Sequence, residues 1–137
     1  MGSVIFVDTS VFVAILSKES DWRDFSQAIE AAETRLTSAV VRLETCIVLG
    51  TRLKLSPREA ERQFAKLLLS AEIEEAPIDS AVGAAAVACF EQYREGRHPA
   101  RLNFADCLSY ACAKTHGAAL LFKGDDFAQT DVKARSA

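Results

Sequence analysis

Residues 4–10 read VIFVDTS, a run of β-branched and aromatic side chains that ends at Asp8. A continuous apolar run of this length is typical of a strand that is buried on both faces of a parallel sheet. Thr9 and Ser10 can cap a helix, so we expect a helix from Thr9 to about Lys18. This stretch therefore predicts a buried strand, a carboxylate at the carboxyl end of that strand, and then a helix.

The alternation of strands and helices continues along the chain. Three more strands are expected, at residues 35–38, 72–78 and 118–122, and the charges and Pro77 of the second place it near a sheet edge. The expected helices span residues 22–33, 40–53, 56–69, 79–95 and 103–115. This alternation predicts an α/β fold whose central, mainly parallel sheet carries helices on both faces.

Length and composition are those of one globular domain covering residues 1–137. Half of the residues are hydrophobic and 26% are charged, which is enough apolar material for a core. There are 16 basic and 19 acidic residues, and the formal net charge is −3, so the protein does not hold nucleic acid through bulk positive charge. Any contact with nucleic acid must therefore be local.

The sequence predicts a cytoplasmic protein with no membrane anchor. No apolar run approaches the roughly 18 residues of a transmembrane helix, and no basic stretch precedes an apolar leader. The cysteines lack the spacing of a zinc or redox motif, so we expect them to be small buried hydrophobic residues in a reducing compartment. They are Cys46, Cys89, Cys107 and Cys112.

Acidic residues follow two of the expected strands. Asp8 ends the first strand, and Asp125 and Asp126 lie in a turn after the last one. Ligands of parallel α/β sheets bind beyond the carboxyl ends of the strands, which makes both positions candidate site residues. A structural interpretation is also open, because Asp8 suits a helix N-terminus and a pair of Asp residues suits a turn.

Glu44 lies within an apolar stretch of an expected helix. A carboxylate among apolar side chains is costly unless it reaches a partner or a cation. Pairing with Arg42 or Arg52 is the structural alternative to a functional role. The apolar residues expected to face inward on this helix are Val40, Val41, Leu43, Ile47 and Val48.

Asp106 follows Asn103 by three residues, at the start of an expected helix. Capping of that helix explains the pair without any further function. Strand ends and helix N-termini gather at one edge of a parallel sheet, however. The four acidic positions can therefore converge at that edge.

Carboxylates that converge in one cleft repel one another, and their pKa values rise unless positive charge is supplied. Clustered oxygen donors suit Mg²⁺ or Mn²⁺. A bound divalent ion activates water and stabilises the charge on a phosphate under attack. The acidic positions therefore predict metal-dependent phosphodiester hydrolysis, and phosphate binding without hydrolysis is the alternative.

Four segments resemble those of a known family, in the same order along the chain. They are VIFVDTS at residues 4–10, RLE at 42–44, RLNFADC at 101–107 and LFKGDDFAQTD at 121–131. This ordered set resembles the PIN-domain ribonucleases, and within them the VapC-type toxins of toxin–antitoxin pairs. The resemblance implies a three-layer α/β/α fold, RNA cleavage with Mg²⁺ or Mn²⁺, homodimerisation, and inhibition by a cognate VapB-type antitoxin, including in a higher toxin–antitoxin assembly.

The same resemblance implies that the acids hold the metal ion and are catalytic. The fourth acid comes from the Gly-Asp-Asp turn, where the family pattern fits either member of the pair, so both stay candidates. A hydroxyl of Thr9 or Ser10 would help to position the site, and Asn103 either supports Asp106 or only caps its helix. The implied catalytic and metal-binding residues are Asp8, Glu44, Asp106, Asp125 and Asp126.

A short basic run precedes Asp106. Arg97, His98 and Arg101 are expected to hold RNA phosphates beside the acidic site, because phosphate contacts supply most of the affinity for nucleic acid. A solvated loop is the alternative interpretation. The sequence shows no aromatic platform for stacking bases, so it does not predict which RNA is recognised.

Other interpretations fit the sequence less well. A phosphatase of the haloacid dehalogenase type needs a second Asp two residues after Asp8, where this chain has Ser10. A phosphorylation receiver domain needs a pair of acids at the end of the first strand, where this chain has one. A PIN-like module that binds RNA or an antitoxin without cleavage remains the alternative from another functional class.

Dimerisation is also predicted from the apolar content of three helices. The first two expected helices and the helix over residues 56–69 carry more apolar side chains than one small sheet needs to cover it. Apolar surface of this kind favours pairing with a second copy of the chain.

Overall fold

The computed structural model describes residues 2–94 and 96–135. Its five strands form one parallel sheet in the order β3-β2-β1-β4-β5. The strands are β1 (Val4–Val7), β2 (Thr34–Thr37), β3 (Glu74–Glu75), β4 (Ala119–Leu121) and β5 (Ala134–Arg135). The predicted α/β fold with a central parallel sheet is confirmed, and the strand that follows the second helix pair lies at a sheet edge as expected.

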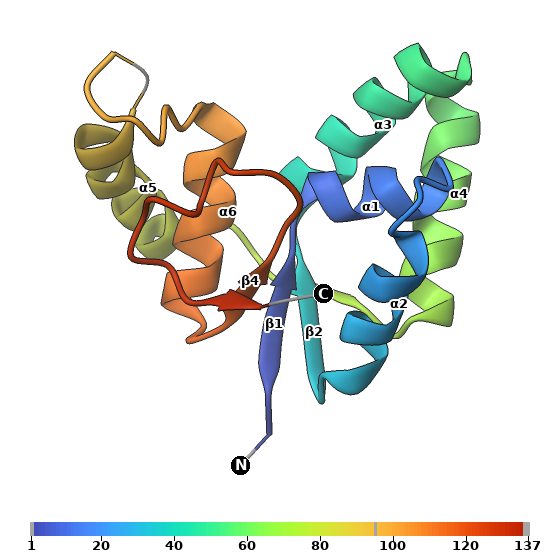
Figure 1. Ribbon diagram of the computed structural model, residues 1–137, viewed down its shortest axis with the longest axis horizontal. Coiled ribbons are helices and arrows are strands. Elements are labelled where there is room, and N and C mark those ends of the chain that lie inside the picture. The colour runs from blue at the N-terminus through green and yellow to red at the C-terminus, as the bar shows by residue number, and fades with distance from the viewer. Residues whose placement is uncertain (1, 95, 136–137) are drawn as a thin grey trace.

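The helices cover both faces of the sheet, in three layers. Figure 1 shows α1 to α4 on one side of the sheet and α5 and α6 on the other. The two groups also pack among themselves, α3 against α4 and α5 against α6. The helices are α1 (Thr9–Leu16), α2 (Trp22–Ala31), α3 (Ala39–Leu53), α4 (Pro57–Ser70), α5 (Ser80–Tyr93) and α6 (Phe104–Thr115).

Strand β1 is the centre of the core. Ile5, Phe6 and Val7 are buried, as expected for a strand with a parallel neighbour on each side and helices on both faces. The backbone N–H of Asp8 donates to the carbonyl of Leu121 at 3.1 Å, so the sheet hydrogen bonding continues to the acid itself. The carboxyl end of β1 is thereby fixed next to the end of β4.

Two local predictions about helices are wrong. Thr9 and Ser10 do not cap α1, because the backbone is still extended at Asp8 and helical from Thr9, so Asp8 is the N-cap. On α3, Leu43 and Ile47 are 63% and 60% exposed instead of facing inward. The helix buries a different stripe, which consists of Val41, Thr45, Cys46 and Leu49.

The buried face of α3 was predicted wrongly because this helix carries apolar side chains on two faces. Val41, Thr45 and Leu49 follow one another at intervals of four and share a face, whereas Leu43 and Ile47 lie on another. Strand β5 was missed because its two residues carry no apolar pattern. The predicted end of α5 at Glu95 lies outside the described residues.

The prediction of a dimer rested on excess apolar side chains on three helices, but the exposed apolar side chains lie mainly on other helices. Helices α1, α2 and α4 bury most of their large apolar side chains in the core, with Leu69 as an exposed exception on α4. Large apolar side chains are exposed mainly on α3, α5 and α6. These are Leu43, Ile47 and Leu53 on α3, Val87 and Phe90 on α5, and Phe104 on α6.

All four cysteines are buried and free, as predicted. Within residues 2–94 and 96–135, no helix combines the length and the apolar character that crossing a lipid bilayer requires.

Candidate active site

A cleft of about 370 Å³ lies at the carboxyl ends of β1 and β4. In Figure 1, α1 and α3 leave this end of the sheet on one side and α6 lies on the other. Acids from four separate segments meet there, because parallel strands end at one edge. The cleft is lined by Asp8, Thr9, Ser10, Val13, Glu19, Glu44, Val48, Arg52, Asn103, Asp106, Lys123 and Asp126.

Asp8 is both the N-cap of α1 and a buried member of the cleft. Its Oδ2 accepts hydrogen bonds from the backbone N–H of Ser10 at 3.1 Å and from the Ser10 hydroxyl at 2.7 Å. Burial raises the pKa of Asp8 above its ordinary value, and hydrogen bonds from Ser10 and Ser109 oppose that rise. The capping interpretation is therefore correct for Asp8, and it coincides with a place in the cleft.

Glu44 lies at the margin of the buried stripe of α3 and is half-buried. Its Oε1 accepts a hydrogen bond from the Thr9 hydroxyl at 2.5 Å. Burial raises the pKa of Glu44, and the negative charge of Asp8 adds to that rise. The carboxylate of Glu44 therefore faces another acid.

Pairing of Glu44 with a neighbouring arginine, the structural alternative, is wrong. The guanidinium of Arg42 contacts Glu75 at 2.5 Å and Glu61 at 3.3 Å. The guanidinium of Arg52 contacts Glu19 at 2.6 Å. Both cations are thus engaged with other carboxylates.

Asp106 forms a capping box with Asn103 at the start of α6. The Asp106 N–H donates to Asn103 Oδ1 at 2.9 Å, and the Asn103 N–H donates to Asp106 Oδ2 at 3.1 Å. Burial and then the negative charges of Asp8, Asp126 and Glu44 raise the pKa of Asp106 to about 7, against the hydrogen bond from Asn103. Asp106 therefore senses the charges of three other acids that line the cleft, Asp8, Glu44 and Asp126.

The structure separates the two acids of the Gly-Asp-Asp turn. Asp126 lines the cleft, whereas Asp125 is exposed and does not belong to its lining. The carbonyl of Asp125 accepts a hydrogen bond from the N–H of Ala128 at 3.2 Å, which turns the chain. The turn interpretation thus describes Asp125, and Asp126 is the member of the pair that joins the other acids.

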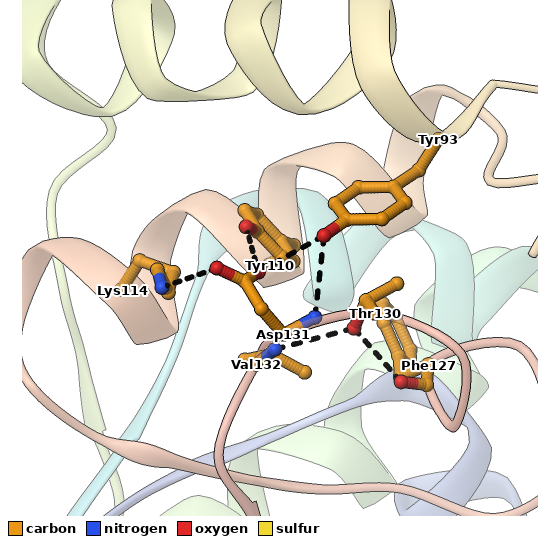
Figure 2. Close-up of polar contacts among 7 residues, drawn as sticks. All are labelled: Tyr93, Tyr110, Lys114, Phe127, Thr130, Asp131 and Val132. Atoms are coloured by element: carbon orange, nitrogen blue, oxygen red, sulfur yellow. Dashed lines mark hydrogen bonds and ion pairs between the residues drawn. The ribbon is translucent and has the colours of Figure 1, made fainter.

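A polar cluster around the exposed carboxylate of Asp131 fastens the loop that carries Asp126. Figure 2 shows Asp131 at the centre, where its carboxylate accepts hydrogen bonds from the hydroxyls of Tyr93 and Tyr110 and contacts the Lys114 ammonium at 3.0 Å. The hydrogen bond from Tyr110 is the main cause that lowers the pKa of Asp131. Because Tyr93 and Tyr110 are buried on α5 and α6, the loop after β4 is tied to both helices.

Three charged residues of the cleft were missed from the sequence. Glu19 follows α1, Arg52 lies on the last turn of α3, and Lys123 follows β4. Arg52 could have been found from its spacing, because Glu44, Val48 and Arg52 follow at intervals of four and share one helix face. For Glu19 the sequence offers no comparable signal.

The basic residues predicted to contact RNA lie outside the described lining of this cleft. Arg97 and Arg101 are exposed on the loop between α5 and α6. His98 is partly buried, with its ring edge-on to Tyr93 at 4.9 Å and its Nδ1 accepting a hydrogen bond from the Ala100 N–H at 3.0 Å. The loop that these residues share leads directly into Asn103 and the start of α6.

The donor chemistry of the cleft fits a hard divalent cation. Carboxylate oxygens are the ligands that Mg²⁺ and Mn²⁺ prefer, and the mutual repulsion of Asp8, Glu44, Asp106 and Asp126 is relieved by positive charge. Across the described part of the chain, no three acidic, histidine or cysteine side chains are grouped tightly enough to enclose an ion. The acids share a cleft, and the carboxylates of Asp8, Glu44 and Asp106 each accept a hydrogen bond from a neighbouring hydroxyl or backbone amide.

The model of the PIN domain family matches residues 5–133. The chain belongs to this family. Membership confirms the resemblance carried by the four segments, and it disfavours the phosphatase and receiver interpretations. The PIN domain places its four acids on the first strand end, the third helix, the sixth helix and the loop after β4.

Relatives of this PIN domain are VapC ribonucleases. Ribonuclease VapC30 of Mycobacterium tuberculosis is 40% identical over 126 residues, which cover 92% of this chain and 94% of that protein. The crystal structure of VapC20 from the same species, described as a toxin that cleaves the sarcin–ricin loop, has a TM-score of 0.72 at 19% identity and covers 93% of this chain and 95% of its own. A toxin–antitoxin complex from Klebsiella pneumoniae contains a chain with a TM-score of 0.67 at 21% identity, covering 94% and 93%.

Replacing Asp106 by Asn should stabilise the metal-free protein at pH 8 and should stabilise it less at pH 5. The pKa of Asp106 is raised to about 7 in the folded protein from 3.8, so ionisation costs folding free energy increasingly as the pH rises through that range. We expect a gain of about 1–3 kcal/mol at pH 8, less than a dry site would give because water enters the cleft. Urea unfolding in EDTA measures the difference in free energy of unfolding between the variant and the wild type. A variant that is less stable than the wild type at both pH values would contradict the claim that the Asp106 charge destabilises the fold.

Replacing Tyr110 by Phe should destabilise the protein by about 1–2 kcal/mol, because the charged Asp131 carboxylate loses the hydrogen bond from the buried Tyr110 hydroxyl. Lys114→Met removes the exposed partner of the same Asp131 and should cost less than about 1 kcal/mol. Thermal or urea unfolding of the two variants compares them directly. Equal losses would show that the buried hydroxyl is not the main fastening of the loop.

Proposed function

We propose that this protein is an endoribonuclease of the VapC type that hydrolyses RNA phosphodiester bonds with Mg²⁺ or Mn²⁺. The observation that carries the proposal is the meeting of Asp8, Glu44, Asp106 and Asp126, from four separate segments, in one cleft at the carboxyl end of the sheet. The VapC ribonucleases that it resembles over nine-tenths of its length support the reaction class. We propose the whole chain, residues 1–137, as the single catalytic domain.

In this proposal the four acids hold the ion, and neighbouring polar groups hold the acids. The Ser10 hydroxyl orients Asp8, the Thr9 hydroxyl orients Glu44, and the backbone N–H of Asn103 orients the Asp106 carboxylate. The ion supplies the Lewis acidity that activates water and offsets charge on the phosphate. These roles for Thr9, Ser10 and Asn103 rest on their hydrogen bonds to the acids.

Protons and the ion compete for Asp106. Its pKa of about 7 means that the metal-free cleft retains part of a proton at neutral pH. A cation must displace that proton, so its affinity for the cleft rises with pH. Arg97, His98 and Arg101, on the loop leading to α6, bind the RNA backbone outside the cleft in this proposal.

We also propose that the protein acts in the cytoplasm as a homodimer and that a small VapB-type antitoxin inhibits it, including in a higher toxin–antitoxin assembly. Apolar side chains exposed on α3, α5 and α6 supply surface for such contacts. A module that only binds RNA or an antitoxin is less well supported, because the full set of acids lines the cleft.

Cleavage of a mixed RNA pool by antitoxin-free protein tests the proposal. We expect cleavage with Mg²⁺ or Mn²⁺, none in EDTA, and at least about a 100-fold loss in Asp8→Asn, Glu44→Gln and Asp126→Asn, because each removes a charged metal ligand. Asp125→Asn is the matched control on the same turn and should stay within about threefold of wild type, since its side chain lies outside the cleft. Absence of cleavage with every divalent ion, or equal cleavage by all variants, would refute the assignment.

A further inference from the structure

Two cations on the wall of the acidic cleft contact one and the same carboxylate. Arg52 Nη1 lies 2.6 Å from Glu19 Oε2, and Lys123 Nζ lies 2.6 Å from Glu19 Oε1. The Lys123 ammonium also lies 3.2 Å from Asp21 Oδ1. Glu19, Arg52 and Lys123 all line the cleft that contains the four acids.

The backbone, and not only these ion pairs, places Glu19 there. Lys18 adopts the left-handed conformation with φ of 56° after the end of α1. The Glu19 N–H donates to the carbonyl of Ala14 at 2.9 Å, and the Lys18 N–H donates to that of Ile15 at 3.2 Å. This pair of bonds is a Schellman motif, which reverses the chain at the helix end and holds Glu19 beside it.

Lys123 is linked to the acids through its backbone. Its N–H donates to the Ser10 hydroxyl oxygen at 2.9 Å, and that hydroxyl donates to Asp8 Oδ2 at 2.7 Å. Ser10 is therefore the single residue that links the Lys123 backbone to Asp8, a proposed metal ligand. An anion that Lys123 binds would lie next to the acidic centre.

The cleft needs cations if RNA is to enter it. Its described lining holds five carboxylates and two cations, Arg52 and Lys123, and both cations contact Glu19. RNA carries a negative charge at every nucleotide, and Lys and Arg contacts to phosphates supply most of its affinity for proteins. Arginine and lysine bind a phosphate with the same donors that they offer to a carboxylate.

We propose that Arg52 and Lys123 bind a backbone phosphate of the RNA next to the bond that is cleaved, and that Glu19 occupies both cations in the free protein. The inference rests on the proposed ribonuclease function. The Arg52 and Lys123 side chains are 55% and 39% exposed, and ion pairs at such exposure add little to stability, so a phosphate can replace Glu19 readily. Glu19 is then an internal competitor of the substrate.

This exchange is tested by variants that remove one of the two cations and by a variant that removes the competing carboxylate. In an Asp106→Asn parent, which is not expected to cleave, binding of a fluorescein-labelled single-stranded RNA is followed by anisotropy with Mn²⁺ at several salt concentrations. Arg52→Gln and Lys123→Gln should each weaken binding about three- to tenfold and reduce the slope of log affinity against log salt by about 0.7, the value for one lost phosphate contact on a single strand. Glu19→Gln should tighten binding about threefold or more, because both cations lose the Glu19 carboxylate, although Lys123 keeps its contact with Asp21.

Arg42→Gln is the matched control, since Arg42 lies on the same helix but contacts Glu61 and Glu75 away from the cleft. It should change RNA affinity less than twofold. Arg52→Gln and Lys123→Gln variants that bind RNA as tightly as Arg42→Gln would overturn the phosphate site. A Glu19→Gln variant that binds no more tightly than its parent would overturn the competition.

The proposed function fails independently of this inference. Wild-type protein that cleaves no RNA refutes the ribonuclease assignment, whatever the binding measurements show. Wild-type protein that cleaves RNA while the cation variants bind normally refutes only the phosphate site.

Discussion

The burial and crowding of carboxylates in one cleft is the constraint on which the rest of this structure depends. Asp8, Glu44 and Asp106 each have a raised pKa, and for Glu44 and Asp106 the charges of neighbouring acids add to the effect of burial. A cluster of this kind lowers the stability of the metal-free fold at neutral pH. A divalent cation turns the same arrangement into a binding site.

The fold produces this crowding through ordinary helix capping. Asp8 caps α1, and Asp106 completes the capping box of α6, so local backbone requirements already fix two of the acids. The parallel order of the strands then brings those helix starts to one edge of the sheet. Capping and site membership are thus not alternatives here, because the hydrogen bonds that cap the helices also orient the carboxylates.

The sequence predicts the parts of this molecule that depend on local pattern. The run from Val4 to Val7 identifies the central strand, and acids at strand ends and helix starts identify the positions that meet in the cleft. Features set by tertiary packing were not predicted. Asp125 and Asp126 are equivalent in sequence, and only the path of the loop fastened at Asp131 separates them.

Other omissions have similar physical causes. The inward face of α3 was misjudged because the helix is apolar on two sides, and only contact with the core distinguishes Val41 from Leu43. Glu19 enters the cleft through a left-handed turn at Lys18, a position where glycine would be the usual signal. Lys123 was visible beside the acidic turn, but its partner lies more than 100 residues away.

Anomalous diffraction from crystals grown with Mn²⁺ tests the central claim most directly. The account predicts a Mn²⁺ ion within about 2.5 Å of carboxylate oxygens from at least two of Asp8, Glu44, Asp106 and Asp126, with Asp125 turned away. A cleft that stays free of Mn²⁺ while the ion binds elsewhere on the protein would contradict it.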